Sequence, residues 1–333
     1  MIIAIPDDYQ LLAATLDCYA QLAGHEVRIF QGPARDDDEL VRQLNDAEAV
    51  ILIRERTTIT RDLLARLPRL RHIAQTGRST HHIDVAACTA SGITVSTGNS
   101  SSAHTIAEYT WALILASRRN ICAQVETMRR GEWLHQLGLG LNGKTLGIHG
   151  FGKIGSLVAN GGKSFGMRVI TWGGDESRRR ALDAGCEFVE SKHALYAQSD
   201  VLSLNLRLSA QTRHSVTAAD LGAMQPSALL VNTARAEIIA PGALVAALRQ
   251  GRPGYAAVDV YENEPVLNGD HPLLKMPNVL CTPHSAWIEQ AMFECYFGEA
   301  FVNVVKFARG APANLANPEA LHAKNAAHGA GSG

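Results

Sequence analysis

Short apolar runs alternate with amphipathic stretches along most of the chain. Helical patterns at 11–22 and 60–66 lie among the runs of the first hundred residues. Four runs occur in that part, at 2–5, 27–30, 49–53 and 73–74. Continuous apolar runs of this length are typical of parallel strands that are buried on both faces. The pattern therefore predicts a small βαβ domain.

A second series of the same kind follows a long helical pattern at 102–119, which we interpret as a bridge between two domains. Its six apolar runs lie at 146–149, 169–172, 201–206, 229–232, 256–260 and 279–282. Helical intervals separate most of them, and such an alternation describes a doubly wound parallel sheet. The pattern is helical again at 289–309.

Composition narrows the possible partners. The 333 residues contain 31 Lys and Arg against 32 Asp and Glu, so charge gives no reason to expect nucleic acid or an anionic membrane as a partner. No segment approaches the ~18 apolar residues of a membrane span, and the start lacks the basic region of a signal peptide. The six cysteines form no C-x-x-C pair, so we expect reduced thiols in a cytoplasmic protein that binds a small molecule.

A glycine-rich turn stands between a predicted strand and a predicted helix, in the segment TLGIHGFGKIG. Gly150 permits a tight turn, Gly152 lets backbone N–H groups approach a pyrophosphate, and Gly155 allows the helix to pack closely on the strand. A lone G-x-G-x-x-G motif is weak evidence, but this one has the strand and helix that the motif requires. We therefore expect dinucleotide binding by the residues of the turn, which are Gly150, Phe151, Gly152, Lys153, Ile154 and Gly155.

The end of the next strand bears on the choice of dinucleotide. A carboxylate usually stands there and binds the ribose hydroxyls of NAD. Here the position holds Gly173, with Asp175 and Glu176 shortly after it, and these carboxylates could still reach a ribose. The next four residues are Ser177, Arg178, Arg179 and Arg180. The arginines could surround the 2′-phosphate of NADP or form the solvated start of a helix, so NAD and NADP both stay open.

Three late segments place candidate catalytic residues just after predicted strands. Arg235 follows NTA, Glu264 lies in DVYENEP, and His284 ends TPH. Each alone has an ordinary explanation as a surface arginine, a turn carboxylate or a packed histidine. Because ligands bind at the carboxyl ends of parallel strands, the three together behind a dinucleotide turn suit reduction of a 2-oxo acid. Arg235 would orient the substrate, His284 would transfer a proton, and Glu264 would fix the tautomer of His284.

With these motifs the chain resembles the D-isomer-specific 2-hydroxyacid dehydrogenase family from about the first strand to about Pro318. The matching segments are HGFGKIG, VNTARAEII, AVDVYENEP and TPH. The resemblance implies the same roles for Arg235, Glu264 and His284, and places Asp259 near the nicotinamide. We also expect the dinucleotide to contact Asn205, Thr233 and Ala234 at strand ends.

The resemblance also implies the architecture. The expected architecture is an α/β fold with two Rossmann-like or flavodoxin-like domains, each built on a doubly wound parallel sheet. The cofactor domain, 100–286, is inserted into a split substrate domain made of 1–99 and 287–320. The small polar residues of 321–333 predict a flexible tail. Family members are typically homodimers, and the helix at 102–119 would belong to the dimer-forming region.

The family's substrate loop is matched with differences. Its backbone N–H groups hold the substrate carboxylate, and here the loop reads Gly77-Arg78-Ser79, with two added side chains. Arg78 either contacts a second anionic group or points to solvent. Arg54 matches a family position at the domain cleft, or is an ordinary arginine at a strand end. The adjacent His81 and His82 have no third ligand nearby, so no metal site is expected.

The leading hypothesis is hydride transfer between NAD(P)H and a 2-oxo acid or its D-2-hydroxy acid. A phosphoglycerate dehydrogenase-like enzyme that acts on a phosphorylated hydroxy acid is the runner-up, because Arg54 and Arg78 are cationic. A dinucleotide-sensing binding protein without turnover is the alternative from another class. The sequence does not name the acid, because pocket shape depends on loops. Trp287, near His284, either narrows the pocket or packs the hinge.

Overall fold

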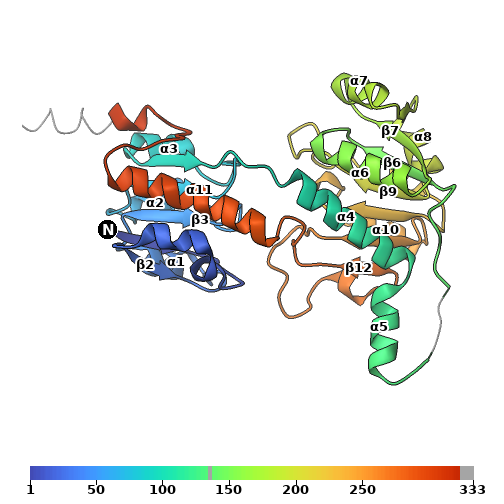
Figure 1. Cartoon of the computed structure of the whole chain (residues 1–333), viewed down its shortest axis with the longest axis horizontal. Coiled ribbons are helices and arrows are strands. Elements are labelled where there is room, and N and C mark those ends of the chain that lie inside the picture. The colour runs from blue at the N-terminus through green and yellow to red at the C-terminus, as the bar shows by residue number, and fades with distance from the viewer. Residues whose placement is uncertain (134–136, 323–333) are drawn as a thin grey trace, which may run out of the picture. The chain divides into compact units, whose positions relative to one another are not determined.

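The computed structural model describes residues 1–133 and 137–322, which form two compact units (Figure 1). Unit 1 contains Met1–Ser101 and the chain from Glu289 on, and unit 2 contains Ser102–Ile288. Most of the predicted tail, from residue 323, lies outside the described residues.

Among the described residues, the sheet of unit 1 has five parallel strands: β1 (Ile2–Ile5), β2 (Glu26–Ile29), β3 (Ala49–Leu52), β4 (His72–Gln75) and β5 (Thr94–Thr97). They lie in the order β2-β1-β3-β4-β5, which is the flavodoxin-like order. The helical elements of unit 1 are η1 (Ala13–Thr15), η2 (Asp17–Leu22), α1 (Asp37–Leu44), α2 (Arg61–Ala65), α3 (Val85–Ala90) and α11 (Gln290–Ala308).

Both faces of the unit 1 sheet are buried, which explains the continuous apolar runs. Side chains such as Val50, Leu52 and Ile73 form one core with α1, α2 and α3. The other face is covered by α11, which packs on β3, β4, β5 and η2. The helix at the end of the chain thus completes the domain that the start of the chain begins (Figure 1).

Unit 2 has seven parallel strands in the part of the chain that the structure describes: β6 (Thr145–His149), β7 (Arg168–Trp172), β8 (Glu187–Phe188), β9 (Val201–Leu204), β10 (Leu229–Asn232), β11 (Tyr255–Val258) and β12 (Val279–Cys281). They lie in the order β12-β11-β10-β9-β6-β7-β8, which is the doubly wound Rossmann order with one added strand. The helical elements are α4 (Ala103–Arg118), α5 (Ile121–Arg129), α6 (Lys153–Ser164), α7 (Asp175–Asp183), α8 (Lys192–Gln198), α9 (Ala218–Gly222), η3 (Ala236–Ile238), α10 (Ala243–Arg249) and η4 (Pro272–Lys275).

Alternate residues of the unit 2 strands enter two separate cores. Leu230 and Val258 pack in one core with residues of α8, α9 and α10. Leu229 and Val231 pack in the other, with residues of α4 and α6. A doubly wound sheet therefore carries both groups of helices, as the sequence pattern predicts.

The structure differs from the sequence pattern in several short elements. The pattern at 11–22 predicts one helix, but the chain forms the two 3₁₀ segments η1 and η2. The pattern does not predict β5 or β8. The sequence of β5, TVST, is buried but mostly polar, and β8 has only two residues, so neither gives a hydrophobic run.

Other chemistry that bears on function is absent from the described residues. None of their helices has the length and hydrophobicity for a bilayer crossing. They also contain no group of three or more His, Cys, Asp or Glu side chains that could hold a metal ion. All six cysteines lie in this part of the chain and carry free thiols.

Candidate active site

The glycine-rich turn connects β6 to α6 and has the geometry of a pyrophosphate cradle. Gly150 has φ of +92°, and a Cβ there would lie 3.0 Å from the carbonyl oxygen of Asn205. A Cβ on Gly155 would overlap the carbonyl oxygen of Gly150. Gly152, the N-cap of α6, faces open space and has no capping side chain. The turn therefore fits a dinucleotide phosphate, which would bind at the exposed N-terminus of α6.

Ser177 occupies the space between this turn and the end of β7. Its hydroxyl accepts a hydrogen bond of 3.3 Å from the backbone N–H of Phe151. A Cβ added to Gly173 would meet the Ser177 Cβ at 3.0 Å and would lie 3.7 Å from the Cα of Gly150. Gly173 therefore does stand beside the glycine-rich turn. The sequence pattern did not single out Ser177 as a neighbour of the turn, because its place depends on where α7 begins.

The arginines of α7 have other partners. Arg179 forms ion pairs with Glu176 at 2.8 Å and Asp183 at 3.7 Å. Arg180 pairs with Glu176 at 3.7 Å. The Arg178 guanidinium lies 5.6 Å from the centre of the Phe188 ring. The arginine run is thus the exposed face of a helix, one of the two interpretations that the sequence leaves open.

The three candidate catalytic residues lie at neighbouring strand ends in unit 2. Arg235 follows β10, and its Nη1 donates a hydrogen bond of 2.7 Å to the carbonyl oxygen of Ala234. His284 follows β12, and its Nδ1 lies 2.5 Å from Glu264 Oε2. The other carboxylate oxygen of Glu264 accepts a bond of 2.9 Å from the backbone N–H of Tyr261. The structure thus contains the His–Glu pair that the sequence predicts.

Asp259, at the end of β11, holds the loop that carries His284. Its Oδ1 accepts bonds from Thr282 Oγ1 at 2.6 Å and from the backbone N–H of Ser285 at 2.8 Å. Its Oδ2 accepts a bond of 2.8 Å from the N–H of Ala286. Asp259 is fully buried, and burial raises the pKa of its carboxyl above the ordinary value. The carboxylate of Asp259 thus bonds residues before and after His284, so its visible role is to position that loop.

The loop after β4 in unit 1 has the features of an anion site. Gly77 has φ of +96° and lies beside the Arg54 guanidinium. Among the described residues, the backbone N–H groups of Gly77, Arg78 and Ser79 have no acceptor within hydrogen-bond distance. Three consecutive N–H groups next to a cation can bind a carboxylate. Arg54 itself has φ of 53° and packs its guanidinium 5.0 Å from the centre of the Tyr296 ring.

Other predicted residues lie as follows. Thr233 is buried, and its Oγ1 lies 2.9 Å from Thr110 Oγ1 on α4. No sequence pattern predicts this contact. Asn205 follows β9, and its buried Oδ1 has no hydrogen-bond partner in the described part of the chain. Asp175 starts α7 and is exposed. Trp287 is buried, with 4% of its surface exposed.

The comparisons with known proteins agree with this geometry. The model of the D-isomer specific 2-hydroxyacid dehydrogenase NAD binding domain matches residues 111–286. A glyoxylate reductase of Aeropyrum pernix is 40% identical over 295 residues, which cover 85% of this chain and 87% of that protein. The chain belongs to the D-isomer specific 2-hydroxyacid dehydrogenase family.

Two enzymes named for phosphoglycerate are also similar to this chain. A D-3-phosphoglycerate dehydrogenase of Methanocaldococcus jannaschii is 36% identical over 261 residues, which cover 78% of this chain but 49% of that protein. The crystal structure of a phosphoglycerate oxidoreductase from Vibrio cholerae O395 is 47% identical, with a TM-score of 0.90 and coverage of 93% of this chain and 100% of that one.

Family membership confirms the predicted fold and the predicted class of reaction. The protein is an oxidoreductase that acts on CH–OH donors and transfers a hydride between a nicotinamide dinucleotide and a 2-oxo or 2-hydroxy acid. The glycine-rich turn described above fits that cofactor in this chain. The exposed N-terminus of α6 and the open space at Gly152 are the observations that carry the fit.

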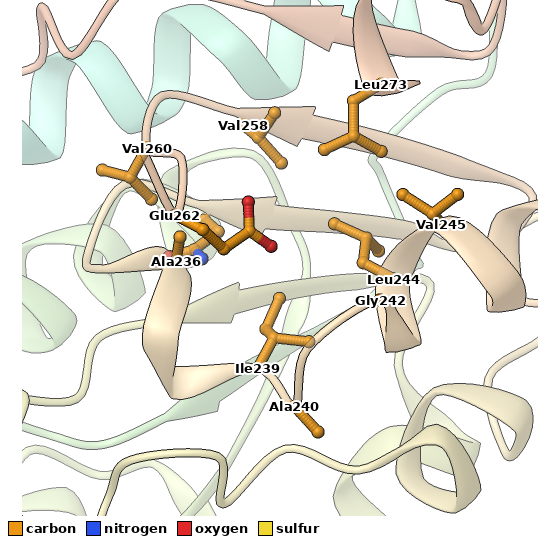
Figure 2. Close-up of a pocket in the computed structure, with 11 residues that line it drawn as sticks. Ala236, Ile239, Ala240, Gly242, Leu244, Val245, Val258, Val260, Glu262 and Leu273 are labelled. Atoms are coloured by element: carbon orange, nitrogen blue, oxygen red, sulfur yellow. The ribbon is translucent and has the colours of Figure 1, made fainter. Parts of the chain in front are cut away.

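A small cavity lies in unit 2, and Asn232 is one of the residues that line it (Figure 2). Its walls are mainly apolar, with Leu244, Val258 and Leu273 among them, and the Glu262 carboxylate lies between these side chains. The free space holds about one water molecule. The cavity is therefore too small for a 2-oxo acid.

Proposed function

We propose that this enzyme reduces a small 2-oxo acid to its D-2-hydroxy acid, and catalyses the reverse reaction, with His284 as the proton donor and acceptor. The observation that carries the proposal is the 2.5 Å contact between His284 Nδ1 and Glu264 Oε2 at the strand ends of a dinucleotide-binding unit. The nicotinamide, when bound, supplies or accepts the hydride.

Glu264 determines which nitrogen of His284 exchanges a proton. Because the Glu264 carboxylate holds Nδ1–H, the free position is Nε2. In reduction, Nε2–H gives its proton to the carbonyl oxygen of the acid while the hydride adds to the carbon. In oxidation, the neutral Nε2 takes the hydroxyl proton back.

Arg235 orients the acid in this proposal. A guanidinium presents a planar fork that can bind the carboxylate and the carbonyl oxygen of a 2-oxo acid together. Its bond to the carbonyl of Ala234 fixes the fork at the end of β10. Asn232 supports the same turn, since its side chain bonds the N–H of Ala234 and the carbonyl of Arg235, both at 3.0 Å.

The proposed roles of the two units follow from these positions. Unit 2 would bind the dinucleotide through the glycine-rich turn, with Asn205, Thr233, Ala234 and Asp259 at the strand ends. Unit 1 would bind the substrate carboxylate through Arg54 and the N–H groups of Gly77, Arg78 and Ser79. The support in unit 1 is the run of unpartnered N–H groups beside Arg54.

We propose that NAD is preferred over NADP. The arginines that could bind a 2′-phosphate face Glu176, Asp183 and Phe188 instead. Asp175 stands in the first turn of α7, two residues after Gly173, and would repel a 2′-phosphate. Because Gly173 lacks a carboxylate, we expect the preference to be modest.

Steady-state turnover tests the proposal. The purified protein is assayed with glyoxylate, pyruvate and hydroxypyruvate, each with NADH and with NADPH. We expect measurable reduction of at least one acid and a higher kcat/KM with NADH. A protein that binds NADH but turns over none of the acids would instead be a dinucleotide sensor.

A phosphorylated hydroxy acid is the second candidate substrate. Arg78 is exposed, so its guanidinium is accessible to a second anionic group. The similar phosphoglycerate oxidoreductase favours the same candidate. Oxidation of 3-phosphoglycerate with NAD at a kcat/KM above that for every unphosphorylated acid would select it.

We also propose that the enzyme is a homodimer and that α5 takes part in the interface. Ile121, Val125 and Met128 lie on one side of α5 at helical spacing, and 46%, 42% and 56% of their surfaces are exposed. A second copy of the chain is the partner that the family resemblance implies. Light scattering should give a dimer for the parent and a monomer for Val125→Glu with Met128→Glu, and a monomeric parent would contradict the proposal.

The proposed location is the cytoplasm. Its support is that all six cysteines carry free thiols, which a reducing compartment maintains. Fractionation of cells that express the protein tests this location.

A further inference from the structure

Ser79 and His81 form a hydrogen-bonded pair on the loop after β4. Ser79 Oγ lies 2.7 Å from His81 Nδ1. Ser79 is the third residue of the run whose backbone N–H groups have no acceptor among the described residues. Its side chain and its N–H group belong to the same Cα, so groups bound to the two lie a few ångströms apart.

His81 is held in place from a second side. The ring of His82 meets it edge to face, with centres 5.6 Å apart and an angle of 76° between the planes. His82 is buried, and burial lowers its pKa from 6.5 to about 4, so its ring is neutral at neutral pH. With its Nδ1 as the acceptor, His81 orients the Ser79 hydroxyl.

The direction of the hydroxyl determines what it can bind. When Ser79 donates its proton to His81 Nδ1, the Ser79 oxygen presents only lone pairs to a ligand. Lone pairs attract a hydroxyl donor and do not attract an anionic oxygen. The pair therefore suits a neutral hydroxyl group close to the bound carboxylate.

We propose that Ser79, oriented by His81, accepts a hydrogen bond from a hydroxyl group on C3 of the substrate, and that the enzyme thereby prefers 3-hydroxy-2-oxo acids. This inference rests on the proposed function, in which the carboxylate of the acid binds the N–H groups of the same loop. Carbon 3 is two bonds from that carboxylate carbon, which matches the short separation between the Ser79 N–H and Oγ. Ser79 is then a substrate-binding residue, and His81 is a positioning residue that acts through it.

The test compares hydroxypyruvate with pyruvate, which differ by the C3 hydroxyl. The measured quantity is the ratio of kcat/KM for the two acids, in which general effects of a variant on folding or loop shape cancel. Ser79→Ala should lower the ratio about three- to tenfold, since one neutral hydrogen bond is lost. Ser79→Thr keeps a hydroxyl and should retain most of the preference. An unchanged ratio in Ser79→Ala would overturn the inference.

A double-mutant cycle tests the role of His81. His81→Ala should lower the ratio in the parent, but should change it no further in Ser79→Ala, because it acts through the serine. An equal effect of His81→Ala in both backgrounds would show that His81 does not act through Ser79. If Ser79→Ala does not fold, His81→Ala still tests the inference. A lower ratio of kcat/KM for hydroxypyruvate over pyruvate supports it, and an unchanged ratio contradicts it. A parent that reduces glyoxylate but neither of these acids would overturn the inference and leave the proposed function standing. A parent that reduces none of the three acids would contradict the proposed function itself.

Discussion

His284 adopts a left-handed backbone conformation, with φ of 51°, at the point where β12 ends. Among residues other than glycine this conformation is uncommon, although asparagine, aspartate and histidine adopt it more readily than most. Here Glu264 holds the ring, and Asp259 holds the chain on both sides of the residue, through Thr282 before it and through Ser285 and Ala286 after it. These bonds place an imidazole with one nitrogen fixed and the other available, as proton transfer requires.

At the same scale, Arg235→Lys should not behave as a conservative change. Lysine offers one point charge where arginine offers a planar two-pronged contact, so KM for the 2-oxo acid should rise and kcat should fall. Steady-state kinetics with saturating NADH measure both constants. Arg249→Lys, an exposed arginine at the end of α10, is the matched control. Unchanged Michaelis constants in Arg235→Lys would remove Arg235 from substrate binding.

Gly173→Asp should shift cofactor use toward NAD. The new carboxylate would accept bonds from ribose hydroxyls and repel a 2′-phosphate. The added Cβ would lie 3.0 Å from the Ser177 Cβ, so Ser177 must move by a few tenths of an ångström. The measurement is the ratio of kcat/KM for NADH and NADPH. Gly222→Asp, which adds the same charge to α9 where space is open, should leave that ratio as in the parent. A ratio that does not change in Gly173→Asp would show that position 173 does not face the ribose.

At the scale of elements, the sequence predicts those strands that contain a continuous hydrophobic run. The runs of β3 and β10, AVIL and LLVN, are fully buried and were readable from the sequence. The polar strand β5 was not, because part of its burial comes from α11, about 200 positions later in the chain. The same reason explains the site. Arg235, Glu264 and His284 could be placed at strand ends, whereas Ser177 and Thr110 depend on how α7 and α4 pack.

The turn after β12 provides the test at this scale. Asp259→Asn should free one side of the His284 loop, because an amide NH₂ group cannot accept from the N–H groups that the carboxylate now bonds. We expect a loss of about 1–3 kcal/mol in the free energy of unfolding and a fall in kcat larger than any change in NADH binding. Urea unfolding and steady-state kinetics measure the two effects. Glu262→Gln, on the same loop after β11, is the control. If Asp259→Asn kept the stability and the kcat of the parent, Asp259 would not position the loop.

At the scale of the whole molecule, the three buried histidines of the described residues link stability to pH. Burial lowers the pKa of His72 to about 3 and those of His82 and His149 to about 4. The first two lie in unit 1 and the third in unit 2. Between pH 6.5 and these values the unfolded chain binds protons that the native rings do not. Stability contributed by these rings is therefore complete above pH 6.5 and is lost as the pH falls.

When the pH falls from 7 to 5, each of these buried rings should lower the free energy of unfolding by about 2 kcal/mol. His72→Gln should reduce that dependence by about this amount, since glutamine does not titrate. Urea unfolding at the two pH values, with the exposed His193→Gln as control, gives the comparison. The same pH dependence in His72→Gln and in the parent would show that His72 is not buried in the neutral form.

The central claim is that His284 transfers the proton in a 2-oxo acid reductase, and His284→Ala tests it most directly. The variant, the parent and His193→Ala are assayed for reduction of the best 2-oxo acid, and NADH binding is followed by fluorescence titration. The account predicts that His284→Ala loses at least ~100-fold in kcat and still binds NADH, because general acid–base catalysis contributes that much or more. Turnover by His284→Ala close to that of the parent would contradict it.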